Sequence, residues 1–162
     1  MKVLIVSDTH RRDANLVEVL KHEKPIDCLI HLGDVEGSED FIREIAECPV
    51  HIVSGNNDFF CSLPREEEFT LGKYKVLITH GHYYYVSLDL QEIRRQAESR
   101  GADIVMFGHT HRPLLEKCGK VLLLNPGSLA YPRQEGRKPS YIRMEVDEEG
   151  EASFEILYLK HR

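Results

Sequence analysis

Polar residues that can bind a metal ion follow several apolar stretches of this sequence. Asp8 and His10 come directly after the apolar stretch 2–7, and Asp34 ends a second such stretch. Carboxylate, imidazole and amide groups together favour a divalent metal site with mixed oxygen and nitrogen ligands. None of the four cysteines belongs to this group, which argues against a structural zinc site built on thiolates.

The complete group of such residues is too large for a single ion. It comprises seven side chains: Asp8, His10, Asp34, Asn56, His80, His109 and His111. Two ions that share one carboxylate use seven side chains and still leave coordination positions for water and substrate. Two divalent ions carry four positive charges, and the two carboxylates of this group cancel only two of them. The remaining positive field predicts a substrate that contains phosphate.

Strands that alternate with helices must position these residues. Stretches 2–7, 27–34 and 50–55 have the apolar, β-branched character of strands buried on both faces, and the patterns over 13–23 and 38–47 predict helices between them. This alternation predicts right-handed βαβ units and a largely parallel sheet. Because ligands bind outside the carboxyl ends of such strands, we expect the polar groups to converge on one crevice.

The second half of the sequence is richer in strands. Residues 67–81 are typical of a hairpin that turns near Gly72, and residues 140–159 are typical of another hairpin. Residues 87–101 predict a helix with Ser87 as a possible N-cap. Two packed sheets with outer helices accommodate both halves of the chain.

Size and charge exclude several classes of protein. The chain has 162 residues, of which 41% are hydrophobic and 30% charged, so we expect one soluble domain over residues 1–162. A net charge of −6 argues against stable binding to nucleic acid or to an anionic membrane. The unpaired cysteine pattern and the short first apolar stretch predict a cytoplasmic protein.

Five ordered motifs resemble the calcineurin-like metallophosphoesterases. They are Asp-x-His at 8–10, Gly-Asp at 33–34, Gly-Asn-x-Asp at 55–58, His-Gly-His at 80–82 and Gly-His-Thr-His at 108–111. With Asn-Pro-Gly-Ser at 125–128 and the short chain, they resemble the small bacterial and archaeal phosphodiesterase branch. The resemblance implies an α/β fold: a four-layer α/β/β/α sandwich of two mixed sheets flanked by helices.

The resemblance also implies a role for each candidate ligand. One ion would be held by Asp8, His10 and His111, the other by Asn56, His80 and His109, and Asp34 would bridge both. The expected cofactors are two divalent ions, manganese first, with iron, zinc, cobalt and nickel as alternatives. The expected reaction is hydrolysis of a small phosphodiester, in which a water or hydroxide bridging the two ions attacks phosphorus.

One residue departs from the family pattern. Asn57 stands where many members have a histidine that can act as a general acid. An amide cannot protonate a departing alkoxide at neutral pH, so Asn57 favours activated esters, a leaving group that needs little help, or a donor from elsewhere. His82 is the nearest candidate donor in the sequence, with a supporting or exposed position as the alternative. The catalytic candidates are therefore Asp34, Asn57 and His82.

Other polar residues have simpler interpretations. Asp58 is expected to cap a turn or orient its neighbours. Asn125 and Ser128 either close the site or form an ordinary turn, and Arg133 is either a phosphate contact or a surface arginine. Four histidines have no motif partner and are interpreted as structural or exposed: His22, His31, His51 and His161.

Two other functions compete with the phosphodiesterase. The same metals can attack a monoester, which would make the chain a phosphomonoesterase or nucleotidase, although the missing acid at Asn57 weighs against an alkyl monoester. The family fold also occurs in a retromer subunit that acts mainly as an interaction scaffold. A scaffold need not keep all seven ligands, and this chain keeps them. A homodimer through a strand edge is a further option.

Overall fold

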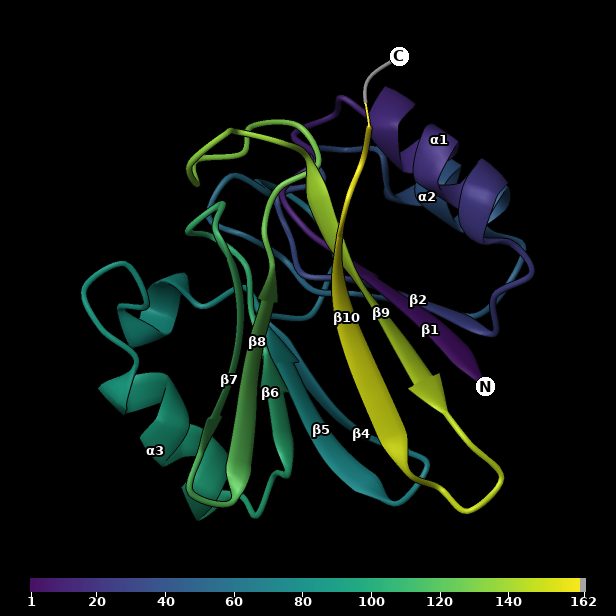
Figure 1. The fold of residues 1–162 in the computed structure, drawn as a ribbon. Helices are drawn as coiled ribbons and strands as arrows, with labels where there is room; N and C mark the ends of the chain where they lie inside the picture. Colours follow the sequence, from purple (N-terminus) through teal and green to yellow (C-terminus); the bar gives the residue numbers. More distant parts are fainter. Residues whose placement is uncertain (161–162) are drawn as a thin grey trace.

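Two five-stranded sheets form the centre of the computed structural model, which describes residues 1–160 (Figure 1). His161, which was interpreted as structural or exposed, lies outside the described residues. Both sheets contain parallel and antiparallel pairs of strands, as expected for mixed sheets.

The first sheet has the strand order β10-β9-β1-β2-β3. Its members are β1 (Lys2–Val6), β2 (Cys28–His31), β3 (Val50–Ile52), β9 (Ser140–Val146) and β10 (Ala152–Tyr158). Strands β1, β2 and β3 are parallel to one another because the helices α1 (Ala14–Glu23) and α2 (Glu39–Ala46) form the crossovers. The hairpin of β9 and β10 adds antiparallel strands beside β1.

The second sheet has the strand order β4-β5-β6-β8-β7. Its members are β4 (Glu66–Leu71), β5 (Tyr74–Thr79), β6 (Ile104–Met106), β7 (Pro113–Cys118) and β8 (Val121–Pro126). Strands β5, β6 and β8 are parallel, whereas β4 and β7 pair antiparallel at the two edges. The 3-10 helix η1 (His82–Tyr84) and the helix α3 (Gln91–Ser99) connect β5 with β6.

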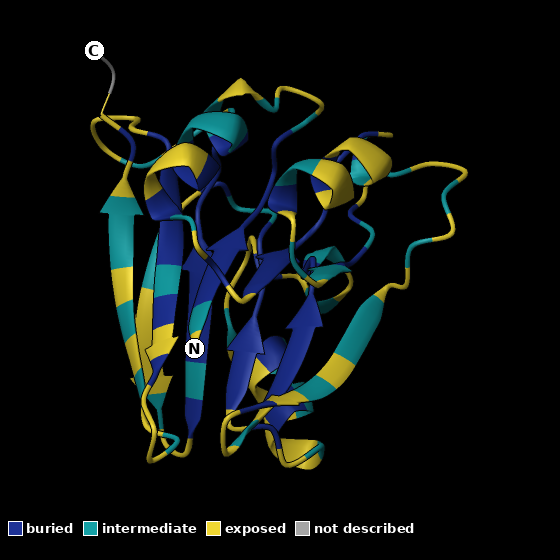
Figure 2. Cartoon of the chain, turned by 90° about the vertical axis from the view of Figure 1, so that its right-hand side faces the viewer, coloured by how far each residue is buried: buried dark blue, intermediate teal, exposed yellow. Residues whose placement is uncertain are grey.

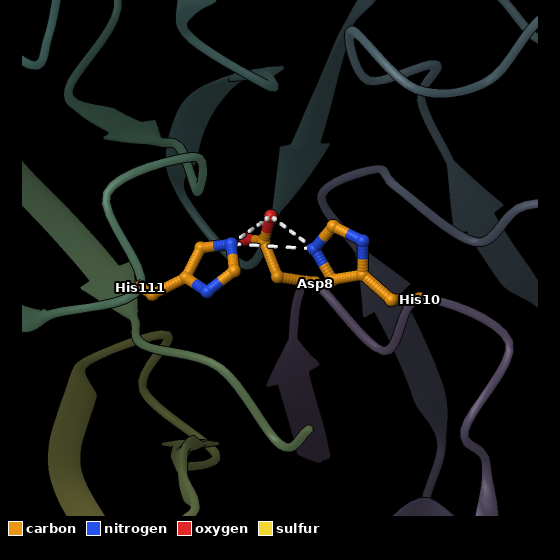
Figure 3. A group of neighbouring side chains, drawn as sticks. All are labelled: Asp8, His10 and His111. Atoms are coloured by element: carbon orange, nitrogen blue, oxygen red, sulfur yellow. Dashed lines mark hydrogen bonds and ion pairs between the residues drawn. The ribbon is translucent and has the colours of Figure 1, made fainter. Parts of the chain in front are cut away.

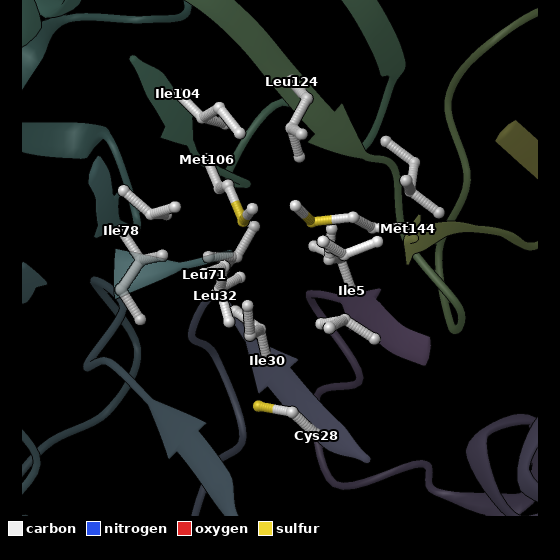
Figure 4. Close-up of a cluster of buried hydrophobic side chains, with 14 of the residues drawn as sticks. Ile5, Cys28, Ile30, Leu32, Leu71, Ile78, Ile104, Met106, Leu124 and Met144 are labelled. Atoms are coloured by element: carbon white, nitrogen blue, oxygen red, sulfur yellow. The ribbon is translucent and has the colours of Figure 1, made fainter. Parts of the chain in front are cut away.

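Three apolar clusters separate four layers. One lies between the two sheets and includes Ile5, Ile30, Ile78 and Met144 (Figure 4). A second cluster joins the first sheet to α1 and α2, and a third joins the second sheet to α3. The central strands are buried, whereas the outward faces of the helices are exposed (Figure 2). The predicted four-layer sandwich is confirmed.

The prediction for the third helix was wrong at its start. The helix begins at Gln91 rather than near Ser87, and Ser87 is not its N-cap. A turn holds the preceding segment, because the backbone N–H of Leu88 donates to the carbonyl of Tyr85, and Oδ1 of Asp89 accepts from Gln91 N–H. Among residues 1–160, no helix has the length and apolar character needed to cross a bilayer.

Candidate metal centre

The first group of candidate ligands surrounds one oxygen of Asp8, directly after β1. Nε2 of His111 lies 3.2 Å from Oδ1 of Asp8, and Nε2 of His10 lies 3.7 Å from the same oxygen. The two Nε2 atoms lie 3.2 Å apart, so the three donor atoms form a small triangle (Figure 3). We call Asp8, His10 and His111 the first donor set.

The second group surrounds Oδ1 of Asn56, in the loop after β3. Nε2 of His80 lies 3.0 Å from this oxygen, and Nδ1 of His109 lies 3.1 Å from it. We call Asn56, His80 and His109 the second donor set. Asp34 lies between the sets, because its Oδ2 is 3.7 Å from Nε2 of His10 and 3.5 Å from Nε2 of His80. The structure thus brings all seven predicted ligands into one cluster.

The cluster fits divalent metal ions. Oδ2 of Asp8 accepts hydrogen bonds from Oγ of Ser7 at 2.5 Å and from the backbone N–H of His109 at 3.0 Å. Oδ1 of Asp8 is buried and has no hydrogen-bond partner within residues 1–160, which is costly for a carboxylate. Atoms bound about 2.1 Å from a tetrahedral or octahedral ion lie about 3.0 to 3.4 Å apart, and the spacings in both donor sets fall in this range except that between His10 and Asp8.

The backbone of the cluster has an uncommon conformation. Five candidate ligands have a positive φ between 47° and 72°: Asp8, His10, Asp34, His109 and His111. Such left-handed residues are unfavourable for L-amino acids and cluster at functional sites. Two glycines allow the close approach of the loops. A Cβ atom on Gly55 would lie 2.1 Å from Oδ1 of Asp34, and one on Gly108 would lie 2.1 Å from Oγ of Ser7.

Backbone carbonyl groups orient one histidine of each set. Nδ1 of His80 donates a hydrogen bond to the carbonyl oxygen of Leu32 at 2.6 Å, and Nδ1 of His111 donates to that of Tyr131 at 2.7 Å. Because a carbonyl oxygen only accepts, Nδ1 carries the hydrogen in both rings. The lone pair on Nε2 is then free to face the cluster, as a metal ligand requires.

The charges in the cluster shift the pKa values of its members. Burial acts to raise the pKa of Asp34, but the contacts with His80 and the hydrogen bonds from Asn57 together outweigh it and lower the pKa to about 2. The Asp8 carboxylate raises the pKa of His10 to about 9, with a further contribution from Glu36, whose Oε1 lies 3.0 Å from Nδ1 of His10. A metal ion that binds here must therefore displace a proton from His10.

Asn57, a catalytic candidate, contacts the aspartate between the two sets. Its side-chain Nδ2 donates to Oδ2 of Asp34 at 3.0 Å, and its backbone N–H donates to Oδ1 at 2.9 Å. It also lines the cleft that contains His10 and His111. Asn57 therefore lies where its amide can donate a hydrogen bond to a group bound at the cluster.

His82, the other candidate, lies beside the second donor set. Its ring centroid is 5.4 Å from that of His80 and 6.0 Å from that of His109. Nδ1 of His82 is buried and has no hydrogen-bond partner among the described residues. Burial, followed by electrostatic repulsion from His80 and His109 whenever those rings are protonated, lowers the pKa of His82 to about 4. The ring is therefore neutral at pH 7.

Asp58 ties two ligand-bearing loops together. Its Oδ2 accepts hydrogen bonds from the backbone N–H groups of Asp34 and Gly55, both at 2.7 Å, and its Oδ1 accepts from that of Glu36 at 2.7 Å. The sequence indicated an orienting role, but the contact with the loop after β2 has no local signal. Asp34 in that loop lies 24 residues from Asp58 along the chain.

Buried polar residues outside the five ligand motifs support the same loops. His31 lies 3.0 Å from Oγ1 of Thr9 through its Nε2, and its Nδ1 accepts from the backbone N–H of Gly33 at 3.1 Å. Oγ of Ser128 donates to the backbone carbonyl of Asp8 at 2.7 Å. These side chains position the ligand loops rather than face the cluster, and for His31 no motif revealed that position.

A family model confirms the resemblance. The model for the calcineurin-like phosphoesterase superfamily domain matches residues 1–149. The chain belongs to this superfamily. It is similar to the probable metallophosphoesterase YsnB of Bacillus subtilis (strain 168), with 40% identity over 134 residues, 82% of this chain and 78% of that protein. It is also similar to the phosphodiesterase MJ0936 of Methanocaldococcus jannaschii, with 31% identity over 78% of this chain and 83% of that protein.

Solved structures share the superfamily fold. A predicted phosphoesterase of Streptococcus pneumoniae TIGR4 superimposes with a TM-score of 0.82 and 29% identity, covering 97% of this chain and 88% of that chain. Wild-type Vps29 of Entamoeba histolytica in complex with zinc superimposes with a TM-score of 0.76 and 25% identity, covering 98% of this chain and 99% of that chain. These two structures show that the chain shares its fold with them over nearly its whole length.

Proposed function

We propose that this calcineurin-like protein is a phosphodiesterase that uses two divalent metal ions, with manganese the preferred ion, and acts on a small phosphodiester. The observation that carries the proposal is the buried Oδ1 of Asp8. It has no hydrogen-bond donor among residues 1–160 and is faced by Nε2 atoms of His10, His80 and His111 at 3.2 to 3.8 Å. The similarity to a phosphodiesterase of Methanocaldococcus jannaschii supports the choice of reaction.

Each donor set would hold one ion, and Asp34 would contact both. Ions bound there would supply a nucleophile by lowering the pKa of water and would offset negative charge on the phosphoryl oxygens. The residues of the chain position the substrate. The side-chain amide of Asn57 donates a hydrogen bond to Asp34. It is therefore close enough to turn toward a phosphoryl oxygen bound at the cluster.

Neither candidate near the cluster supplies a proton to the leaving group at neutral pH. Asn57 carries an amide, and the His82 ring is neutral because its pKa is lowered to about 4. Cations bound beside His82 would disfavour its protonation further. The proposal therefore favours diesters whose leaving groups depart without protonation, and it disfavours alkyl monoesters.

The proposal is tested with manganese-loaded protein and bis(p-nitrophenyl) phosphate, an activated diester. We expect metal-dependent release of nitrophenolate and its loss in Asp34→Asn. The matched control is Asp40→Asn, because Asp40 is exposed on α2, outside the cluster. Equal activity of wild type and Asp34→Asn would overturn the mechanism. Faster turnover of unactivated nucleoside monophosphates than of diesters would instead identify a phosphomonoesterase.

A second candidate function is a metal-independent interaction scaffold. The similarity to Vps29 structures is consistent with it, although one of those proteins was itself solved in complex with zinc. A scaffold does not require the unpartnered Asp8 oxygen or the strained ligand backbone. Metal analysis of freshly purified protein separates the two functions: no bound metal and no uptake on titration would favour the scaffold.

A further inference from the structure

Three arginines line a cleft beside the first donor set. The cleft has a volume of about 800 Å3, and Arg112, Arg133 and Arg137 lie on its wall together with His10 and His111. All three side chains belong to exposed residues. The cleft therefore joins a positively charged wall directly to the cluster of ligands.

These guanidinium groups have no carboxylate partner in the described part of the chain. The ion pairs formed there by arginine involve Arg94, Arg95, Arg100 and Arg143. Within residues 1–160, Glu36 is the one carboxylate that lines the cleft, and its Oε1 is already 3.0 Å from Nδ1 of His10. In a protein with a net charge of −6, a concentration of unpaired positive charge at one cleft indicates an anionic ligand.

Backbone contacts place Arg112 and Arg133 next to the candidate ligand His111. Arg112 directly follows His111, and the backbone N–H of Arg133 donates to the carbonyl of His111 at 3.0 Å. The N–H of Arg137 donates to the carbonyl of Gln134 in the same loop. Arg112 and Arg133 also line a second cavity of about 560 Å3, whose wall includes Phe107. An organic group can therefore lie beside the arginines.

We propose, on the basis of the proposed function, that the substrate is a phosphodiester with a second phosphate group, and that Arg112, Arg133 and Arg137 bind this second phosphate. The reacting diester carries one negative charge, which bound ions already offset. Guanidinium groups bind phosphate oxygens through paired, charge-assisted hydrogen bonds. Three guanidiniums on one cleft wall offer more donors than a planar carboxylate accepts, and they suit the several oxygens of a tetrahedral dianion.

The test compares two substrates that release the same group. They are the p-nitrophenyl ester of thymidine 5′-phosphate and the same ester with a 3′-phosphate. With manganese-loaded protein, we expect KM to be at least about tenfold lower for the ester with the 3′-phosphate. Replacing all three arginines with alanine should remove this difference and leave kcat for the simpler ester within about twofold. The single variant Arg133→Lys should keep only part of the KM difference, because lysine keeps the charge without the paired donors.

A control and a binding measurement separate this inference from the proposed function. Lys120→Ala changes the net charge by the same amount as a single arginine substitution, but Lys120 lies in the turn between β7 and β8, so KM should not change. Calorimetry should show thymidine 3′,5′-bisphosphate binding at least about tenfold tighter than thymidine 5′-phosphate, and only when the arginines are present. Arginine-dependent binding without turnover of either ester would overturn the proposed function alone. Equal KM values and equal affinities for both compounds would overturn the arginine assignment.

Discussion

The two donor sets differ in charge and in how the fold holds them. The first contains the Asp8 carboxylate, borders Glu36 through His10, and opens onto the arginine cleft. The second contains the neutral amide of Asn56 and the fully buried His80, which a backbone carbonyl anchors. More negative charge favours tighter binding of a cation at the first set. The rigid anchor favours a fixed geometry at the second.

The largest expected effect comes from removing one ligand from either set. His111→Ala should disable the first set and His109→Ala the second, and each should lower kcat for bis(p-nitrophenyl) phosphate about a thousand-fold. The reason is that two ions together stabilise several kcal/mol of charge in the transition state. Metal analysis should find one ion less in each variant. Near-normal activity in either variant would show that one set is dispensable.

The anchoring difference predicts unequal effects on stability. His80→Ala leaves a cavity and an unpaired Leu32 carbonyl, so it should lower the free energy of unfolding by about 3 kcal/mol. His10→Ala removes a partly exposed ring that a side chain rather than the backbone holds, so the loss should be about 1 kcal/mol. Urea unfolding of both variants in chelator measures the difference. Equal losses would contradict the anchoring argument.

The affinity of the first set for metal should depend on pH. Before an ion binds, Asp8 and Glu36 hold the pKa of His10 at about 9, so the ring carries a proton at neutral pH. Because the ion must displace this proton, affinity should rise up to about tenfold per pH unit from near neutrality and level off above about pH 9. Chelator competition across this range provides the measurement. Affinity that stays flat between pH 7 and 9 would be inconsistent with a protonated His10.

The smallest expected effect concerns the leaving group. Asn57→His places an ionisable group beside Asp34, where Asn57 now donates two hydrogen bonds. It should increase the rate for an alkyl ester relative to a nitrophenyl ester by about tenfold, less than a well-placed general acid gives. Steady-state rates for one ester of each type test this. An equal effect on both esters would remove the link between Asn57 and substrate choice.

Much of the fold and of the cluster could be predicted from local patterns. Apolar stretches that end in polar residues located β1, β2 and β3, and parallel strands necessarily bring their carboxyl ends to one edge. The ordered motifs then identified the ligand candidates that the structure brings together. The start of α3 was missed because the turn at Leu88 and Asp89 depends on particular hydrogen bonds rather than on periodicity.

Long-range contacts explain what could not be predicted. Asp58 reaches Asp34 across 24 residues, and His31 reaches Thr9 across 22. The arginine cleft combines Arg112 with a loop about 20 residues further along, so its charge is not evident from any one segment. Of the three arginines, only Arg133 was a candidate phosphate contact from the sequence alone. Strands β7 and β8 separate it from Arg112 along the chain, yet both arginines line one cleft.

The central claim is that two ions bind, one at each donor set, with Asp34 between them. Anomalous diffraction from a crystal soaked in manganese tests it most directly. We predict two anomalous peaks, one within ligand distance of Asp8, His10 and His111 and the other within ligand distance of Asn56, His80 and His109, with Asp34 contacting both. A single peak, or peaks away from these side chains, would contradict the claim.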